Sequence, residues 1–252
     1  MSVKIKLIKE VRLENDVLLV GLPGMGYVAK AVADFIINNL GGELFAKIYS
    51  YAFPPQILVG YDGIGRLPKA YLYKVNNMVI FTGDAQPLSP EAQNELSHEV
   101  IKKLIDLGGL SKVIAGAAYV ESAMPEERKV YVVGNDLRII NEFKKLGAQV
   151  LNEGVISGIN GAIIGWAGYY DIPAVTLLGE TWSVIVDSNM TDYRAAKAIL
   201  KILCKYLNLD LNLNVLDMRA NEIESKIREY YREMISQMRR EEGKRRGIMH
   251  TM

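Results

Sequence analysis

Residues 17–30 read Val17-Leu-Leu-Val-Gly-Leu-Pro-Gly-Met-Gly-Tyr-Val-Ala-Lys30, a short apolar run followed by three glycines within six residues. This pattern predicts a buried strand that leads through a tight turn into a helix, the unit from which α/β folds are built. Backbone N–H groups at such a helix N-terminus can hold an anion, so the stretch invites comparison with nucleotide-binding loops.

The glycine spacing departs from both common nucleotide-binding patterns. Gly21, Gly24 and Gly26 give G-x-x-G-x-G with Pro23 inside it, whereas the dinucleotide fingerprint is G-x-G-x-x-G. A phosphate-binding loop needs G-K-[ST] at its end, and here Tyr27 follows the last glycine. The stretch therefore indicates an α/β fold more clearly than it indicates a ligand.

Composition bounds the class of protein. The 252 residues are half hydrophobic, and the net charge of +1 provides no overall field to attract nucleic acid or an anionic membrane. A single cysteine, Cys204, excludes an intramolecular disulfide and a cysteine-based metal cluster. The N-terminus lacks the apolar core of a signal peptide, and no apolar segment is long enough to span a bilayer. We expect a soluble cytoplasmic protein without cofactor or metal.

Strand and helix patterns alternate from residue 15 to about residue 206. We expect strands over residues 17–20, 44–51, 57–61, 69–75, 78–81, 112–117, 129–133 and 174–178, and helices over residues 27–40, 90–107, 137–146 and 193–207. Asn76-Asn77 predicts a hairpin turn, so part of the sheet should be antiparallel and the sheet mixed. Glycines at intervals of three and four over Gly154–Tyr170 predict a helix with one glycine face.

The chain changes character after an α/β core domain at residues 1–212. Residues 213–252 are rich in charge, and an apolar seam recurs at alternating intervals of four and three: Leu216, Ala220, Ile223, Ile227, Tyr230 and Met234. Two interpretations stay open, a helix that lies on its own domain and an oligomerisation helix between subunits. The basic run Arg239–Arg246 is typical of a solvated tail, since no aromatic residue interleaves its charges.

Residues suited to catalysis are few. His98 lies inside a predicted helix, and His250 lies in the charged tail. Cys204 is surrounded by helical leucines and isoleucines, which favours a small buried residue over a nucleophile. No G-x-S-x-G elbow occurs, and no His/Cys pair has the spacing of metal ligands. We therefore predict no catalytic residue and no metal site.

Three carboxylates follow predicted strands: Asp84, Glu121 and Glu180. Ligands of α/β sheets bind outside the carboxyl ends of the strands, so these side chains could line one crevice with the Gly21–Gly26 turn. Alternatively, each carboxylate satisfies N–H groups of its own turn, as short acidic residues commonly do.

Five short motifs occur in order over residues 15–205: Gly21-Leu-Pro-Gly-Met-Gly26, Phe53-Pro-Pro55, Gly83-Asp-Ala-Gln-Pro87, Gly158-Ile-Asn-Gly161 and Gly179-Glu180. Together they resemble archaeal members of the proteasome assembly chaperone family. The resemblance implies a three-layer α/β/α sandwich with a mixed sheet, similar to phosphorylase/hydrolase-like folds. It also implies a homo-oligomer without catalytic activity that assembles or binds the α-ring of the 20S proteasome.

The C-terminus departs from this family pattern. Several family members dock between proteasome α subunits through a tail of a hydrophobic residue, a tyrosine and any residue, whereas this chain ends His250-Thr251-Met252. Our first hypothesis is a homo-oligomeric assembly chaperone or adaptor for α subunits or related protein clients. The rival is an enzyme or binding protein for a small anionic ligand such as a nucleotide, with a crevice made of Gly21, Pro23, Gly24, Gly26, Asp84, Gln86, Asn160 and Glu180.

Overall fold

The computed structural model describes residues 3–124 and 127–229. Its strands are β1 (Val3–Leu7), β2 (Asp16–Gly21), β3 (Glu43–Ser50), β4 (Leu58–Val59), β5 (Gly65–Arg66), β6 (Ala70–Val75), β7 (Met78–Gly83), β8 (Leu110–Glu121), β9 (Val130–Gly134), β10 (Gln149–Val150) and β11 (Ala174–Trp182). Its helices are the 3₁₀ turn η1 (Met25–Tyr27), α1 (Val28–Leu40), α2 (Pro90–Asp106), α3 (Leu137–Lys145), α4 (Ile159–Tyr169), α5 (Ser183–Asp187), α6 (Tyr193–Leu207) and a helix over residues 214–229.

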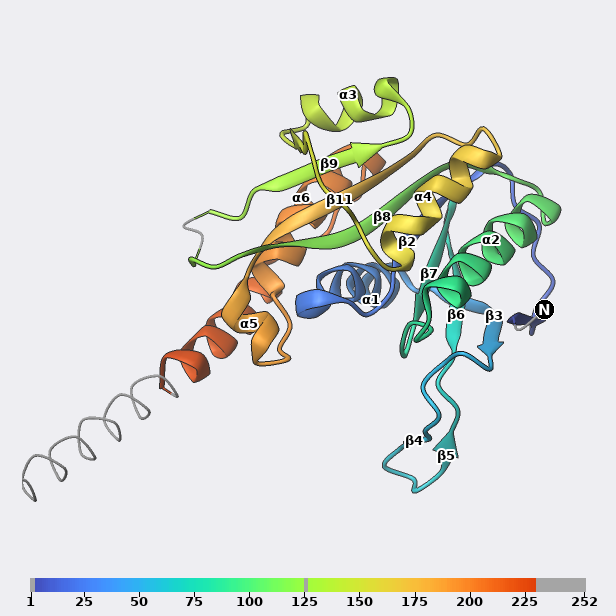
Figure 1. The fold of residues 1–252 in the computed structure, drawn as a ribbon, viewed down its shortest axis with the longest axis horizontal. Coiled ribbons are helices and arrows are strands. Elements are labelled where there is room, and N and C mark those ends of the chain that lie inside the picture. The colour runs from blue at the N-terminus through green and yellow to red at the C-terminus, as the bar shows by residue number, and fades with distance from the viewer. Residues whose placement is uncertain (1–2, 125–126, 230–252) are drawn as a thin grey trace, which may run out of the picture.

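Within the described residues, nine strands form one mixed sheet in the order β1-β3-β6-β7-β2-β8-β11-β9-β10. Helices cover both faces of this sheet (Figure 1), which gives the predicted three-layer α/β/α sandwich. The central strands β7, β2, β8 and β11 run parallel to their neighbours in this group. All of β7 and nearly all of β2 and β11 are buried, as continuous apolar runs predict.

The two faces of the sheet carry separate apolar cores. Along β2, Leu18 and Val20 pack in the core beneath α2 and α4, while Leu19 points into the core beneath α1 and α6. This alternation follows from the two-residue period of a strand. The described part of the chain contains no helix with both the length and the apolar character needed to cross a membrane.

The antiparallel part of the sheet lies on the N-terminal side of β2. The predicted hairpin is confirmed: β6 pairs antiparallel with β7 around Asn76, which has a φ of 49°. The sequence did not predict β1, whose Val-Lys-Ile-Lys-Leu pattern mixes charged with apolar residues. This strand pairs antiparallel with β3 at the edge of the sheet, where lysines discourage pairing with another chain.

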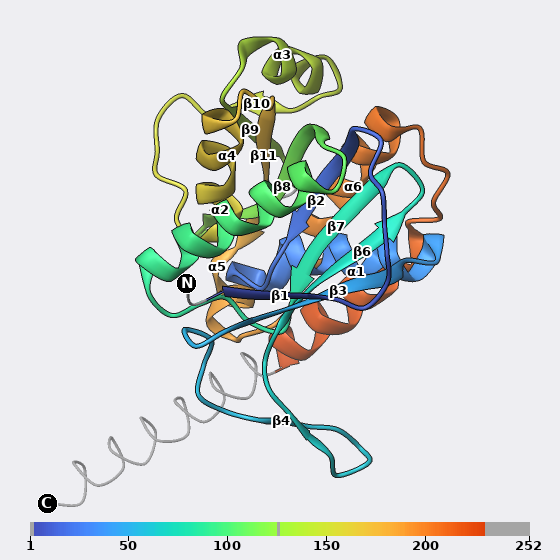
Figure 2. The ribbon, with the colours of Figure 1, turned by 90° about the vertical axis from the view of Figure 1, so that its right-hand side faces the viewer.

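The predicted strand over residues 57–61 is not part of the main sheet. Only Leu58 and Val59 are extended, and they pair with β5 in a separate two-stranded sheet. Residues 51–68, hereafter the arm, leave the body of the molecule and return to it as a long hairpin (Figure 2). Pro54-Pro55 lie between β3 and this apolar run, and because proline cannot donate to a ladder they interrupt strand pairing before the run begins.

The glycine-rich helix begins later than predicted. Gly154 and Gly158 have φ angles of 155° and 81°, which belong to a loop, and α4 starts at Ile159. The glycines inside α4, Gly161, Gly165 and Gly168, keep the spacing of one helical face, but only Gly161 of this face lies close to another backbone. A Cβ at Gly161 would lie 2.2 Å from the carbonyl oxygen of Ile156 in the preceding loop, whereas a Cβ at Gly165 would meet nothing within 4 Å.

Candidate functional site

The turn between β2 and α1 is shaped by close packing. A Cβ on Gly21 would lie 2.3 Å from the carbonyl oxygen of Ala29, so only glycine allows α1 to pack so tightly on β2. Gly26 and Tyr27 both have left-handed φ angles, 58° and 47°, which turn the chain into α1. The carbonyl oxygen of Gly26 accepts a hydrogen bond from the Asp192 N–H at 2.9 Å. The glycine spacing therefore follows from helix packing and chain reversal.

Two side chains from other motifs hold this turn. Gln86 donates from Nε2 to the carbonyl oxygen of Pro23 at 2.6 Å, and its Oε1 accepts from the N–H of Ile159 at 2.9 Å. The Asn160 side chain exchanges two hydrogen bonds with the backbone of Leu22, both at 3.4 Å. Three of the five sequence motifs thus meet in one hydrogen-bonded cluster, and their polar groups bond to one another.

Asp84 lies at the end of β7 and faces the base of the arm. Its Oδ2 accepts from the N–H of Lys69 at 3.1 Å and from the hydroxyl of Tyr71 at 3.0 Å. Burial, together with the charge of Asp84, raises the pKa of the Tyr71 hydroxyl above its usual range. The carboxylate thus secures the strand that follows the arm.

Glu180 is 5% exposed, and it fastens the chain that enters β9. Its Oε2 accepts from the N–H of Lys129 at 3.1 Å, and its own N–H donates to the Lys129 carbonyl. Burial and then the Glu180 charge raise the pKa of the Tyr131 hydroxyl. Glu121 ends β8 opposite Trp182 in the sheet register. Asp84 and Glu180 do bond to backbone N–H groups, but to those of Lys69 and Lys129, 15 and 51 residues away, and not to those of their own turns.

A buried ion pair, which the sequence analysis missed, lies beside these groups. Arg128 and Asp192 have 4% and 1% exposed side chains, and Nη2 lies 3.2 Å from Oδ2. Asp192 also caps α6, since Oδ1 accepts from the N–H of Ala195 at 2.9 Å. Its position before the periodic segment 193–207 was the available signal for the cap, but nothing local in the sequence indicated its pairing with Arg128.

A concave surface of about 690 Å³, hereafter the hollow, lies at the carboxyl ends of β2 and β8. It is lined chiefly by Gly24, Met25 and residues 86–88, 117–120, 151 and 153–158, and also by Asn160. Of the predicted crevice, it includes Gly24, Gln86 and Asn160, but not Gly21, Pro23, Gly26, Asp84 or Glu180. Most of its lining is apolar, and Glu153 is the one charged side chain among the described residues that line it. Its surface suits apolar groups better than an anion.

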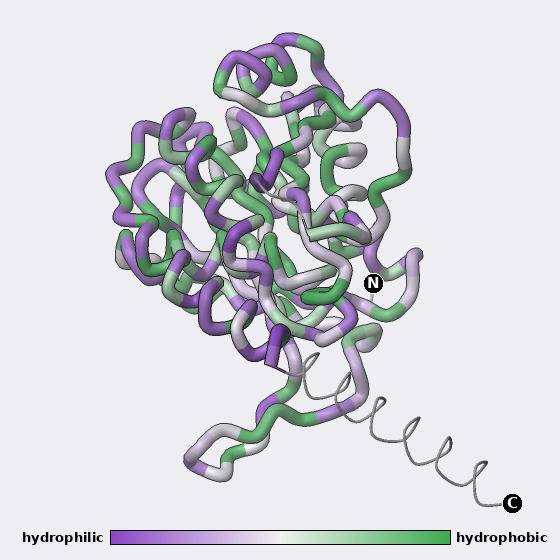
Figure 3. The backbone as a smooth tube through the Cα atoms, turned by 90° about the vertical axis from the view of Figure 1, so that its left-hand side faces the viewer, coloured by the Kyte–Doolittle hydropathy of each residue, from purple (hydrophilic) through white to green (hydrophobic). Residues whose placement is uncertain are grey.

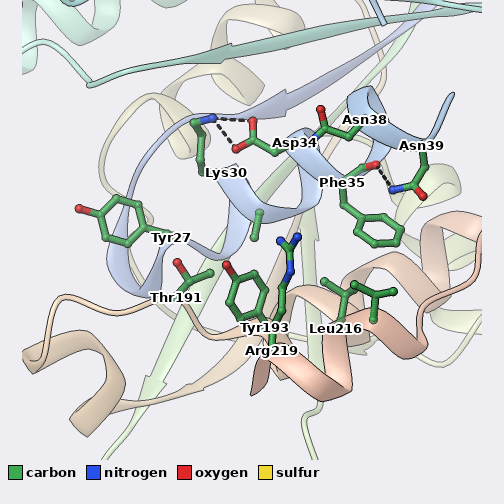
Figure 4. A pocket seen from close by; sticks show the side chains of 12 residues that line it. Tyr27, Lys30, Asp34, Phe35, Asn38, Asn39, Thr191, Tyr193, Leu216 and Arg219 are labelled. Carbon is green, nitrogen blue, oxygen red and sulfur yellow. Dashed lines mark hydrogen bonds and ion pairs between the residues drawn. The ribbon is translucent and has the colours of Figure 1, made fainter. Parts of the chain in front are cut away.

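A smaller cavity of about 350 Å³ lies between α1, α6 and the helix over residues 214–229 (Figure 4). Lys30 forms an i, i+4 ion pair with Asp34 on α1, and the guanidinium of Arg219 lies 5.5 Å from the centre of the Tyr193 ring. Leu216 closes the apolar end of this cavity. The i, i+4 spacing on α1 was readable in the sequence, whereas the partners from the other helices were not.

The helix over residues 214–229 packs on its own chain. Leu216, Ala220 and Ile227 are at most 3% exposed, and Ile223 is partly buried. Arg194 on α6 reaches across to Glu224, with Nη2 3.0 Å from Oε2. The described part of the seam follows the first interpretation, a helix on its own domain; its role between subunits stays a prediction. Tyr230 and Met234 lie outside the described residues.

The remaining chemical candidates are packed in helices. His98 stacks on Trp166 with ring centres 4.4 Å apart, and its Nε2 lies 2.8 Å from the Tyr170 hydroxyl. Burial raises the pKa of the Cys204 thiol, which disfavours a nucleophilic thiolate. Across residues 3–124 and 127–229, no group of three or more His, Cys, Asp or Glu side chains is placed to hold a metal ion.

Comparison with known proteins identifies the family. The sequence profile of the PAC2 family matches residues 18–230. An uncharacterised protein of Methanocaldococcus jannaschii, MJ1210, is 33% identical over 230 residues, which cover 88% of this chain and 87% of that protein.

Two solved structures from Pyrococcus furiosus share the fold. PbaB, an archaeal proteasome activator, has a TM-score of 0.83 at 25% identity and covers 91% of this chain and 99% of its own. PbaA, an archaeal homologue of proteasome-assembly chaperone, has a TM-score of 0.79 at 28% identity, and the match covers 96% of this chain and 97% of PbaA. The profile match spans well over half of the chain, and this protein therefore belongs to the PAC2 family.

Proposed function

We propose that this protein is a non-enzymatic, homo-oligomeric assembly chaperone or adaptor that binds 20S proteasome α subunits or related proteins in the cytoplasm. The observation that carries the proposal is the similarity to PbaA over nearly the whole of both chains. PbaB, described as a proteasome activator, supports a client of the same kind. Likeness of fold alone would not be enough, because one fold serves many functions.

The chemistry of the site supports a binding protein over an enzyme. Asp84, Gln86, Asn160 and Glu180 all form hydrogen bonds with backbone groups of the same chain, and Asp84 also accepts from the Tyr71 hydroxyl. General acid–base catalysis needs such groups within reach of a substrate instead. The rival hypothesis of an anionic ligand gains little from the hollow, since no lysine or arginine is found among the described residues that line it.

The part of the chain that the structure describes offers its own surfaces to a client. We expect an α subunit to bind the folded body over residues 3–124 and 127–229.

The proposal is tested by mixing the full-length protein with α subunits of its own organism and following assembly by native electrophoresis and sedimentation. We expect a co-migrating complex, or a changed yield of α-rings. The double variant His250→Leu with Thr251→Tyr introduces a hydrophobic–tyrosine–any-residue tail and is the comparison for tail docking: it should strengthen binding if α subunits accept such a tail from this protein. Unchanged α-ring assembly together with no complex, for both proteins, would refute the proposal.

A further inference from the structure

The arm exposes an unusual amount of apolar surface. Figures 1 and 2 show it standing away from the body, and Figure 3 shows hydrophobic segments along it. Six of its apolar side chains are more than half exposed: Tyr51, Ile57, Val59, Tyr61, Ile64 and Leu67. Soluble monomers rarely expose contiguous apolar patches of more than a few hundred Å², and larger ones mark interaction surfaces. The arm is therefore built to be covered.

The charge of the arm limits the kinds of surface that can cover it. Asp62 and Arg66 are its only charged residues, and they pair with each other, with Nη2 2.5 Å from Oδ2. The arm thus presents a neutral surface. It has no excess of lysine or arginine to draw it to an anionic membrane, and no free acidic group to draw it to a basic partner. Its chemical counterpart is a concave, apolar surface of low charge.

The same chain carries such a counterpart. The hollow holds about 690 Å³, and three apolar residues of its lining are themselves more than half exposed: Met25, Leu88 and Val155. No residue of the arm, which the structure describes in full, lines the hollow of its own chain. The two adjoin only at the base of the arm, where the N–H of Leu88 donates to the carbonyl oxygen of Ala52 at 2.9 Å. A projecting apolar element and an apolar recess that it does not fill are the two halves of a contact between copies.

We propose that the arm of one copy docks in the hollow of a second copy. This rests on the homo-oligomer of the proposed function and names the surfaces that build it. At about 100 Å² for each half-exposed side chain of this size, the six of the arm offer about 600 Å² of apolar area and the three of the hollow about 300 Å². Two such contacts per copy reach the size of a stable interface, about 1,200–2,000 Å².

The first test traps the contact. In a Cys204→Ala background, a copy with Ile64→Cys in the arm is mixed with a copy carrying Val155→Cys beside the hollow, under mild oxidation. We expect a disulfide-linked pair, formed several-fold faster than when the second copy carries Leu137→Cys. Leu137 lies on α3 and is 75% exposed, so it matches Val155 in access but not in place. Equal rates with both partners would overturn the proposal.

The second test measures mass. We expect Tyr61→Asp with Ile64→Asp to lower the sedimentation mass of the assembly, while Leu137→Asp leaves it unchanged; circular dichroism checks that each variant is folded. A folded arm variant with the mass of the parent would overturn the arm contact and leave the homo-oligomer standing. A parent protein that is monomeric at all concentrations would overturn the homo-oligomer itself. Cross-linking of Ile64→Cys to an α subunit in place of a second copy would assign the arm to the client and reject this proposal.

Discussion

Removal of the Asp192 carboxylate should destabilise the protein more than any other single change at the site. Its side chain is 1% exposed, and one oxygen caps α6 through the N–H of Ala195. The other oxygen accepts from the Trp182 N–H at 3.3 Å and pairs with Arg128 at 3.2 Å. Its backbone N–H also holds the Gly26 carbonyl. One residue thus joins the glycine turn, the end of β11, α6 and the segment before β9.

The magnitude follows from these contacts. Asp192→Asn keeps a side-chain oxygen but removes the charge, and stranding one member of a buried ion pair costs about 3–5 kcal/mol. Asp192→Ala also removes the cap of α6, which costs about 1 kcal/mol more. Domains of ordinary stability have a free energy of unfolding of about 5–15 kcal/mol. The alanine variant should therefore lie near the limit of folding, and the asparagine variant should stay folded but weakened.

Urea denaturation of a double-mutant cycle measures the effect. We expect Arg128→Met and Asp192→Asn each to lower the free energy of unfolding, and the double variant to lose clearly less than the sum, because it leaves no unpaired buried charge. Asp136→Asn is the matched control, since Asp136 caps α3 and pairs with Arg138 at the surface. Its loss should be much smaller. Additive losses in the cycle, or a loss for Asp192→Asn no larger than the control's, would refute this reasoning.

Three further predictions concern glycine, pH and the C-terminal helix. Gly21→Ala should lower the free energy of unfolding by about 1–3 kcal/mol or more, because its Cβ would collide with Ala29. Gly165→Ala, on an open face of α4, should raise the free energy of unfolding by about 0.5–1 kcal/mol. Chemical denaturation of the two variants measures both changes. Burial and then the hydrogen bond to Glu142 raise the pKa of Tyr206, so above about pH 10 the unfolded state should lose its phenolic proton first and stability should fall as pH rises. Tyr206→Phe should flatten this alkaline fall in melting temperature, and an equally steep fall would contradict the assignment. Truncation after Asn212 should lower the melting temperature because it uncovers the core beneath Leu216, Ala220 and Ile227; an unchanged melting temperature would show that the helix over residues 214–229 contributes no packing.

The sequence predicted the central sheet well because its strands are buried on both faces. Such strands need apolar residues at every position, and β2, β7 and β11 meet that need locally. The edge strand β1 was not predicted because its extended form depends on pairing with β3, about forty residues away in the register. The prediction for the arm was wrong because Ile57-Leu-Val59 has the apolar pattern of a core strand without belonging to the main sheet. Prolines and glycines flank this run, and it forms part of a projecting hairpin instead.

Three of the eight residues predicted for the crevice line the hollow, and the hydrogen-bond partners of its polar residues were not predicted. Gly24, Gln86 and Asn160 do converge at the carboxyl ends of the strands, as the topology of an open sheet predicts. What local reading could not supply is the partner of each polar group. Gln86 bonds to Pro23 across 63 residues, and Asn160 bonds to Leu22 across 138 residues. A side chain available to a ligand and one that is already satisfied look identical in sequence.

The difference between a polar side chain that is available to a ligand and one that is already hydrogen-bonded limits how far the motifs can predict a protein partner. The glycines of the β2–α1 turn are needed for helix packing, and Gln86 and Asn160 are needed to tie three segments together. These residues are therefore constrained by the fold itself, whatever the protein binds. The choice between copies falls to surfaces without these constraints, such as the arm, where Tyr61 and Ile64 contribute little to the core. Exchanging the arms of two PAC2 proteins should accordingly change which copies associate while leaving the free energy of unfolding nearly unchanged, whereas Gly21→Ala should lower that free energy and leave the association partner the same.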